Sequence, residues 1–457
     1  MGKTLAEYFK KIILVFTILS LVVSLDVFSQ DTSRIDSIVS AYTHIKEFNG
    51  SVLVARKGKV LLAKGYGFAD QGAGRPNTDS TIFGIASITK TFTSAMILKL
   101  VEKKQLSLDD KLSKFYPDYE FGDMTTIGQL LSHTSGIDDR AIEEKRENFD
   151  KTLLSREQIL LKELNGAKLR SKPGASFSYS NRGYFLLGNI ISKITDMTYE
   201  RAIRKYIFVP FGLTNSGFDF VGSEKIDKAK GYWAETGKDY TKETPAMDSA
   251  GTYAAGSIYS NVYDLYKWHN ILQNYRFVNK KSLERAYHQY TKTYGYGWMI
   301  DSINGRRSLS HSGGFWGFRS NFTRIIDDDI VVILLSNYEV SGLNMITNDI
   351  ISELYGKPVK LPRQKIAVAL SPEQLVKYIG KYEIVEPHLI LEVKLEDGEL
   401  RIYPENGHRS DLSAESEDHF FDKIQENLEV IFGKDRNNKA TMTIIMGESK
   451  RVAIKRD

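Results

Sequence analysis

Short apolar runs of the length of β-strands occur near the start of the chain and again beyond its middle. Residues 51–55 and 60–63 flank a Lys57-Gly58 turn, which predicts a β-hairpin. Later runs predict further strands at residues 307–311, 321–326 and 330–336.

The segment between these two groups of strands has a helical period instead. Apolar residues recur three and four positions apart, which predicts helices over residues 87–103, 184–194 and 262–272. Strands at both ends with helices between them indicate one sheet that is assembled from distant segments and flanked by helices. The sequence therefore predicts an α/β domain with a mostly helical insertion over residues 31–358.

The pattern changes after a linker at residues 357–362. Residues 390–395 and 400–403 alternate between apolar and polar positions across an Asp397-Gly398 turn. Short alternating segments of this kind favour a small all-β domain, similar to a β-barrel, over residues 366–457.

The first 30 residues have the pattern of a secretory signal peptide. Lys10 and Lys11 precede an apolar run at residues 12–25, and the small residue Ser29 follows. As a helix this run spans only ~21 Å, against a hydrocarbon core of ~30 Å, so a cleaved signal is favoured over an uncleaved anchor. We expect an exported, periplasmic or extracellular protein whose only membrane contact is this segment.

Composition excludes several classes of function. The net charge is +5, and no basic block of the kind that nucleic-acid binding requires is present in the sequence. The chain has no cysteine, which excludes disulfides and thiolate metal sites. Its eight histidines lack paired metal-ligand spacing. We therefore expect no metal and no organic cofactor.

Three short motifs carry candidate chemistry: Ser87-Ile88-Thr89-Lys90, Tyr179-Ser180-Asn181 and His311-Ser312-Gly313. Ser87 and Lys90 lie one helical turn apart, so their side chains share a face. An alcohol needs a partner that removes its proton, and a buried lysine with a lowered pKa can do this. The helix N-terminus would stabilise the developing oxyanion.

The other two motifs supply the remaining groups of an acyl-transfer site. Tyr179 could transfer a proton if its pKa were lowered, and Asn181 could bond both the lysine and a substrate amide. Gly313 and Gly314 would let a substrate lie against a strand edge, and the N–H of Gly314 could join that of Ser87 in an oxyanion hole. Taken singly, each motif also has a purely structural interpretation: a helix cap, a surface tyrosine, and a strand end that needs glycine.

Together the motifs resemble those of the serine β-lactamases and penicillin-binding proteins, in the Tyr-x-Asn version of the class C branch. The resemblance covers residues 34–355 and includes residues 126–136, 179–188 and 256–265. It implies a mixed α/β sandwich, with an antiparallel sheet flanked by helices and a further helical region. It also implies acylation of Ser87, general-base work shared by Lys90 and Tyr179, substrate binding by Asn181 and by residues 311–314, and a structural role for His133.

The third motif departs from the family pattern, because His311 stands where members that bind carboxylates carry lysine. An unperturbed histidine is mostly neutral at pH 7, so a substrate carboxylate loses a dependable counter-charge. Arg319 is close in sequence and is a candidate replacement. Esters and peptides with an N-terminal D-residue are therefore as good candidates as β-lactams.

The function predicted from the sequence is that of a serine hydrolase acting through an acyl-serine on a small-molecule or peptide substrate. Two alternatives remain: a non-hydrolytic penicillin-binding or sensor protein, and a D-alanyl carboxypeptidase acting on cell-wall peptides. The intact set of Ser87, Lys90 and Tyr179 argues against the first. The sequence leaves the natural substrate, the oligomeric state and the role of the C-terminal domain open.

Overall fold

The computed structural model describes most of the chain beyond the predicted export segment. The described residues are 32–139, 160, 164, 168–218, 220, 222, 227–234, 239–244, 252–340, 342–386, 388–405, 409–423, 428–446 and 449–456. The predicted signal peptide at residues 1–30 lies outside them. Of the helices that these residues form, none is long and apolar enough to cross a membrane.

Contacts divide the chain into two units. The first contains residues 1–233 and 240–361, and the second contains residues 234–239 and 362–457.

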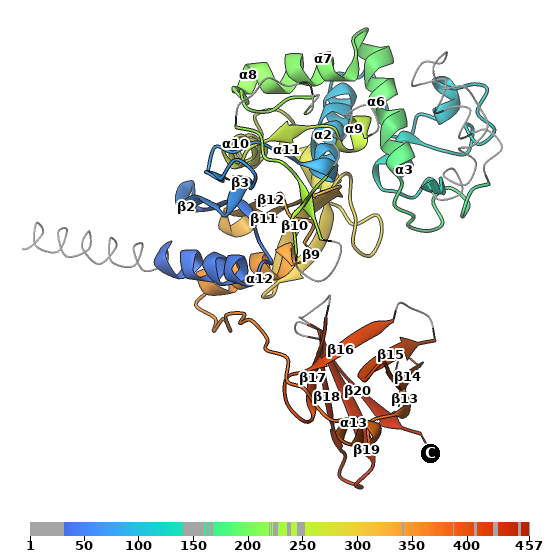
Figure 1. Ribbon diagram of the computed structural model, residues 1–457. Helices are drawn as coiled ribbons and strands as arrows, with labels where there is room; N and C mark the ends of the chain where they lie inside the picture. Colours follow the sequence, from blue (N-terminus) through green and yellow to red (C-terminus); the bar gives the residue numbers. More distant parts are fainter. Residues whose placement is uncertain are drawn as a thin grey trace, which may run out of the picture. The chain divides into compact units, whose positions relative to one another are not determined.

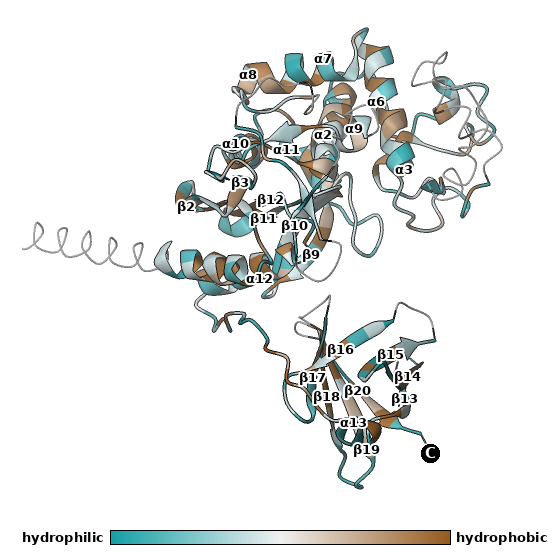
Figure 2. Cartoon of the chain, viewed as in Figure 1, coloured by the Kyte–Doolittle hydropathy of each residue, from teal (hydrophilic) through white to brown (hydrophobic). Residues whose placement is uncertain are grey.

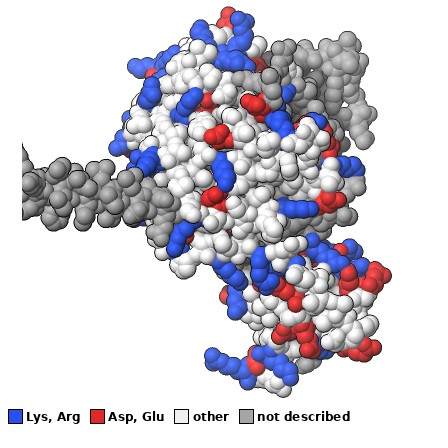
Figure 3. Space-filling model, turned by 60° about the vertical axis from the view of Figure 1, so that its left-hand side comes forward, with Lys and Arg blue, Asp and Glu red and all other residues white. Residues whose placement is uncertain are grey.

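On the face shown in Figure 3, acidic and basic side chains are interspersed over the described surface.

An antiparallel sheet forms the centre of the first unit (Figure 1). Six described strands lie in the order β2-β1-β12-β11-β10-β9. Their bounds are Lys59–Tyr66, Gly50–Arg56, Ile330–Ser336, Phe318–Ile325, Arg306–Phe315 and Met299–Ile303. The N-terminal hairpin β1-β2 therefore joins the strands from the second half through the pairing of β1 with β12.

Both faces of this sheet are buried. Val52, Val54, Val332 and Leu334 face a cluster that includes the helix of residues 32–44 and α12 (Leu343–Leu354). The alternate residues of the same strands belong to the core that contains α2 (Thr89–Glu102), α6 (Asn181–Thr195) and α10 (Val262–Gln273). Burial on both faces explains why β1 and β12 are almost continuously apolar.

The remaining described helices and short strands complete the helical side of the unit. They are α3 (Ile127–Leu131), α7 (Tyr199–Ile203), α8 (Val209–Phe211), α9 (Tyr253–Gly256), α11 (Lys280–Ala286), β3 (Phe68–Asp70), β4 (Arg75–Pro76), β5 (Phe83–Gly84), β6 (Tyr232–Trp233), β7 (Lys242–Glu243) and β8 (Tyr259–Ser260).

The second unit is a closed barrel of strands β13 to β20, preceded by α13 (Pro372–Val376). The strands span Gly380–Ile384, Leu389–Glu396, Glu399–Pro404, Ser410–Ala414, His419–Asp422, Leu428–Lys434, Ala440–Met446 and Ser449–Lys455. Figure 2 shows hydrophilic and hydrophobic residues mixed along these strands, as expected for strands with one inward and one outward face.

The predicted fold class is confirmed, both for the α/β sheet with helices and for the all-β C-terminal part. Local boundaries differ at two functional positions. The helix predicted from Ser87 begins as a 3-10 turn, Ala86–Ile88, before α2 starts at Thr89. The His311 motif does not end its strand, because β10 continues to Phe315 and pairs with β11 to that residue.

Candidate active site

The serine of the first motif lies on a turn between β5 and α2. Strand β5 pairs with β8, and Ile85 N–H donates to the carbonyl of Ile258 at 3.0 Å. Ala86 has a positive φ of 46°, which is uncommon for a residue with a side chain. Ser87 is partly exposed, whereas its neighbours Ile88 and Thr89 are buried. The turn therefore presents one hydroxyl at the surface of the helical core.

Lys90 is fully buried and contacts this hydroxyl. Its Nζ lies 3.0 Å from Ser87 Oγ, 2.9 Å from Asn181 Oδ1 and 2.8 Å from the carbonyl oxygen of Ala255. Burial lowers the pKa of the Lys90 ammonium to about 7, against a smaller opposing effect of the Asp139 carboxylate. Lys90 can therefore exist as a neutral amine near neutral pH, within hydrogen-bond reach of the serine.

The loop before α6 brings the second motif to the same place. Tyr179 shares a side-chain hydrogen bond with Ser87, and Lys90 Nζ lies 4.9 Å from the centre of its ring. Burial nevertheless raises the pKa of the Tyr179 phenol, so the lowered value expected from the sequence is not found. The phenol stays protonated at neutral pH and can donate a proton.

Asp139 fixes the start of α6, although sequence reasoning did not single it out. Its Oδ1 accepts from the Ser180 hydroxyl at 2.7 Å and its Oδ2 accepts from the Asn181 N–H at 2.6 Å. Ser180 in turn caps the helix through Gly183 N–H. Asp139 precedes α6 by 42 positions, so no local pattern connects the carboxylate with the helix it anchors.

His133 packs against the ring of Tyr179. It is fully buried, and its ring centre lies 4.2 Å from that of Tyr179. Its Nδ1 accepts the N–H of Ser180 at 3.0 Å, which places the imidazole proton on Nε2. Burial holds the pKa of His133 well below its usual value. These contacts fit the structural role that we expected for this residue.

The third motif faces the site from β10. His311 is buried, and burial, together with the positive charge of Lys90, lowers its pKa to about 3. Its Nδ1 lies 2.6 Å from the Ser312 carbonyl, which can only accept, so Nε2 accepts from the Tyr294 hydroxyl at 2.9 Å. His311 is therefore a neutral imidazole with both nitrogens used.

Gly313 lets β10 lie directly against the segment that carries the serine. A Cβ at Gly313 would stand 2.4 Å from the Ile85 carbonyl oxygen and 2.4 Å from Ser320 Oγ. Ser320, its partner on β11, donates to that same Ile85 carbonyl at 2.9 Å. Ser312 is partly exposed and Gly314 is exposed, so both residues are accessible to solvent.

Arg319 does not supply a free counter-charge. It pairs with Gly314 across β10 and β11, and its side chain passes close to Gly314. However, its guanidinium bonds Glu339 Oε1 at 2.6 Å and the carbonyls of Phe315 and Phe318.

The structure thus brings the residues of all three motifs to one place. It adds Asp139, Tyr294 and the Ala255 carbonyl, none of which had a recognisable signal in the sequence. Within the described part of the chain, no group of three or more histidine or acidic side chains is arranged to hold a metal ion.

Comparison with known proteins agrees with this geometry. Residues 35–354 match the Beta-lactamase family. Penicillin-binding protein 4* of Bacillus subtilis is 29% identical over 85% of this chain and 91% of its own length. The putative penicillin-binding protein PbpX of the same organism is 29% identical over 68% of this chain and 76% of its own.

Solved structures with a similar fold include relatives in other organisms. An octameric penicillin-binding protein homologue from Pyrococcus abyssi has a TM-score of 0.66 and 27% identity, over 93% of this chain and 99% of that chain. A D-amino acid amidase from Ochrobactrum anthropi has a TM-score of 0.60 and 22% identity, over 70% and 99%, and shows the fold alone. The chain therefore belongs to the beta-lactamase family of serine hydrolases.

Proposed function

We propose that this hydrolase transfers the acyl group of its substrate to Ser87 and then to water. The supporting observation is the buried Lys90 amine, 3.0 Å from Ser87 Oγ, whose pKa is lowered to about 7. A neutral amine at this distance accepts the hydroxyl proton as Oγ attacks the substrate carbonyl. Water then hydrolyses the acyl-serine ester and restores the hydroxyl.

We assign to Tyr179 the donation of the proton that the leaving group requires. The raised pKa keeps the phenol protonated at neutral pH, so we assign the base role in acylation to Lys90 alone. In the second step the Tyr179 phenolate takes a proton from the attacking water, and the Lys90 ammonium returns its proton to Ser87 Oγ. Asn181 holds the Lys90 amine in place through its Oδ1. The backbone N–H groups of Ser87 and Gly314 are the proposed oxyanion donors.

The third motif indicates which substrates fit. His311 is neutral and its nitrogens are already bonded, and Arg319 is neutralised by Glu339. A carboxylate beside the scissile bond would therefore be desolvated without a charged partner among these residues. We propose esters and amides of D-amino acids as substrates, ahead of β-lactams and peptides that end in D-alanine.

Intact-mass measurement tests this proposal. The chain is exposed to a p-nitrophenyl ester, a D-amino-acid amide and a panel of β-lactams, and the acyl adduct and product are followed over time. We expect a transient adduct and turnover with the first two, and no adduct in Ser87→Ala. A wild-type chain that acylates but does not turn over would instead favour the penicillin-binding or sensor function. Turnover that persists in Ser87→Ala would refute the mechanism.

A further inference from the structure

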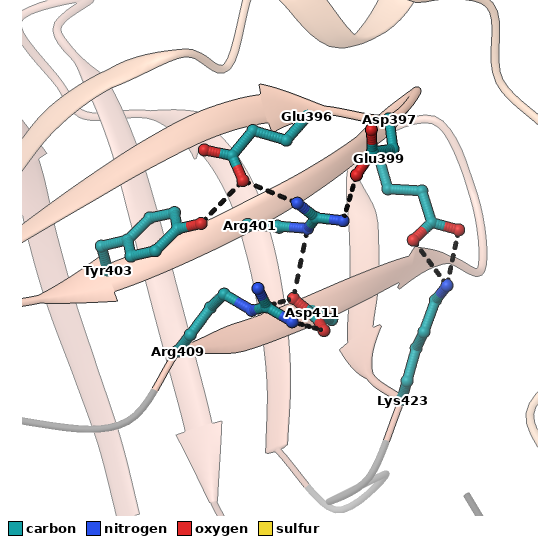
Figure 4. Close-up of polar contacts among 8 residues, drawn as sticks. All are labelled: Glu396, Asp397, Glu399, Arg401, Tyr403, Arg409, Asp411 and Lys423. Carbon is teal, nitrogen blue, oxygen red and sulfur yellow. Dashed lines mark hydrogen bonds and ion pairs between the residues drawn. The ribbon is translucent and has the colours of Figure 1, made fainter. Parts of the chain in front are cut away.

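The barrel of the second unit separates a charged outer face from an apolar interior. Figure 4 shows Arg401 on the outer face, bonded to Glu396 at 2.6 Å and to Asp397 at 2.7 Å, with Asp411 also beside it. On the same strands, Leu391, Leu400 and Ile402 alternate with these residues and are buried. Inward positions can therefore be identified from the strand period.

Side chains fill only one end of the barrel interior. There the ring of Tyr378, just after α13, stacks on the ring of Phe432, with the ring centres 4.3 Å apart. Tyr382 and Phe420 also pack against the ring of Phe432. Met442 and Ala453 are completely buried in this cluster. The aromatic residues close this end.

The other end contains a cavity of about 450 Å³. This is within the size range of small-molecule sites, and barrels of about eight strands are just wide enough to hold one small ligand. Its apolar lining includes Ile384, Leu391, Leu428, Ile444 and Met446. Met446 is 48% exposed although it has the same orientation as buried Met442, so the cavity leaves apolar surface in contact with water. A ligand with an apolar body would cover that surface.

Two arginines line the same cavity, and they differ in their partners. Arg451 lies directly opposite Ile444 in the pairing of β19 with β20, and it shares the inward face of β20 with buried Ala453. Among the described residues, none forms an ion pair or hydrogen bond with its guanidinium. The other arginine of the lining, Arg409, is already bonded to Asp411 (Figure 4). Ser410 and Ser449 also line this end. The buried carboxylate of Asp422 lines it too, from β17, which does not neighbour the strand of Arg451 in the barrel.

We propose that the barrel binds a small amphipathic carboxylate, with its aliphatic chain in the cavity and its carboxylate on Arg451. An apolar wall suits a ligand that is apolar along its length and anionic at one end when a guanidinium without a partner among the described residues stands at its edge. This site is separate from the Ser87 site and does not depend on the proposed hydrolysis.

Titration calorimetry with decanoate tests the site in the full-length chain. We expect decanoate to bind the wild type, and Arg451→Gln to weaken its affinity by about tenfold or more, because a charge-assisted bond is lost. The matched control is Lys450→Gln, which removes the same charge from the outward-facing neighbour on the same strand and should keep the wild-type affinity. Neutral 1-decanol should bind the wild type and Arg451→Gln with similar affinities.

A second variant tests the cavity rather than the charge. Ile444→Phe should reduce the affinity for decanoate and for decanol alike, because the larger ring occupies the space of the chain; circular dichroism confirms that the variant is folded. Failure of decanoate to bind the wild type would overturn the proposal. Equal weakening by Arg451→Gln and Lys450→Gln, or no weakening by either, would also overturn it.

Discussion

At the scale of single residues, the proposed chemistry depends on the protonation of Lys90. Burial favours the neutral amine, and the Asp139 carboxylate partly opposes this effect. The result is a pKa of about 7, where a base is both deprotonated in useful amounts and still able to accept a proton. His133 and His311 are buried and neutral, and therefore add no positive charge beside it at pH 7.

The pH profile should report this group directly. Lys90 must lose its proton to act, so kcat/KM for a neutral ester should rise with pH through an apparent pKa near 7. Asp139→Asn removes the carboxylate charge that raises the pKa of Lys90. The rise of kcat/KM should therefore move to lower pH in this variant. Asp138→Asn removes the same charge from the neighbouring residue and is the control. An unshifted rise in Asp139→Asn would show that this carboxylate does not tune Lys90.

The preference of the enzyme for charged or neutral substrates should depend on residue 311. Replacing His311 with lysine introduces a group whose unperturbed pKa of ~10.4 lies well above that of histidine, so it holds a charge in this buried place more readily than the imidazole does. We expect His311→Lys to raise kcat/KM for a peptide ending in D-alanine, relative to that for a neutral ester, by about tenfold, equivalent to ~1.4 kcal/mol. His311→Gln is the neutral control. The same ratio in both variants would show that charge at this position does not select substrates.

At the scale of elements, the site is formed where β10 crosses the turn that carries Ser87. Gly313 permits this contact, because any side chain there would meet the Ile85 carbonyl and Ser320. The turn is fixed on its other side by β5 and β8 and by the Ile85 to Ile258 hydrogen bond. The position of the nucleophile therefore depends on two neighbouring elements.

Gly313→Ala should push β10 away from the turn that carries Ser87. We expect it to lower the free energy of unfolding by ~1–3 kcal/mol through overpacking. The displacement of β10 should reduce kcat/KM for an ester by about tenfold to a hundredfold. Gly433→Ala in the barrel is the control, because a Cβ there makes only an ordinary 3.6 Å contact with Thr441. Full activity in Gly313→Ala would mean that the strand can shift without moving the oxyanion donors.

At the scale of the whole molecule, the contacts described for the Lys90 amine are formed by residues of one unit. The oxygen partners of the Lys90 amine belong to Ser87, Asn181 and Ala255, which all lie in the first unit. The barrel has its own aromatic core. Chemistry and the proposed carboxylate binding are therefore assigned to different units.

A chain that ends at residue 361 should test this division. Because the three hydrogen-bond partners of the Lys90 amine described above all lie before that residue, we expect kcat/KM for a p-nitrophenyl ester to stay within about threefold of the full-length value. Thermal unfolding followed by circular dichroism checks that the shortened chain is folded. A folded but inactive chain would show that the second unit contributes to catalysis.

The sequence alone determined the element types, the fold class and the residues of the three motifs. The pattern of apolar positions indicates which side chains must leave water. It is sufficient for the continuously apolar strands β1 and β12 and for the amphipathic helix α6. The one-turn spacing of Ser87 and Lys90 is likewise a local property, which the backbone alone imposes.

Only the tertiary structure decided the state of each group. The pKa of Lys90, Tyr179 or His311 depends on how much water and charge surround it. Those surroundings come from distant segments, as with the Ala255 carbonyl, which is 165 positions from Lys90. The same is true of Asp139, which has no local sequence signal, and of the hollow end of the barrel. Burial and long-range contacts are properties of the packed chain, so neither can be read from spacing along it.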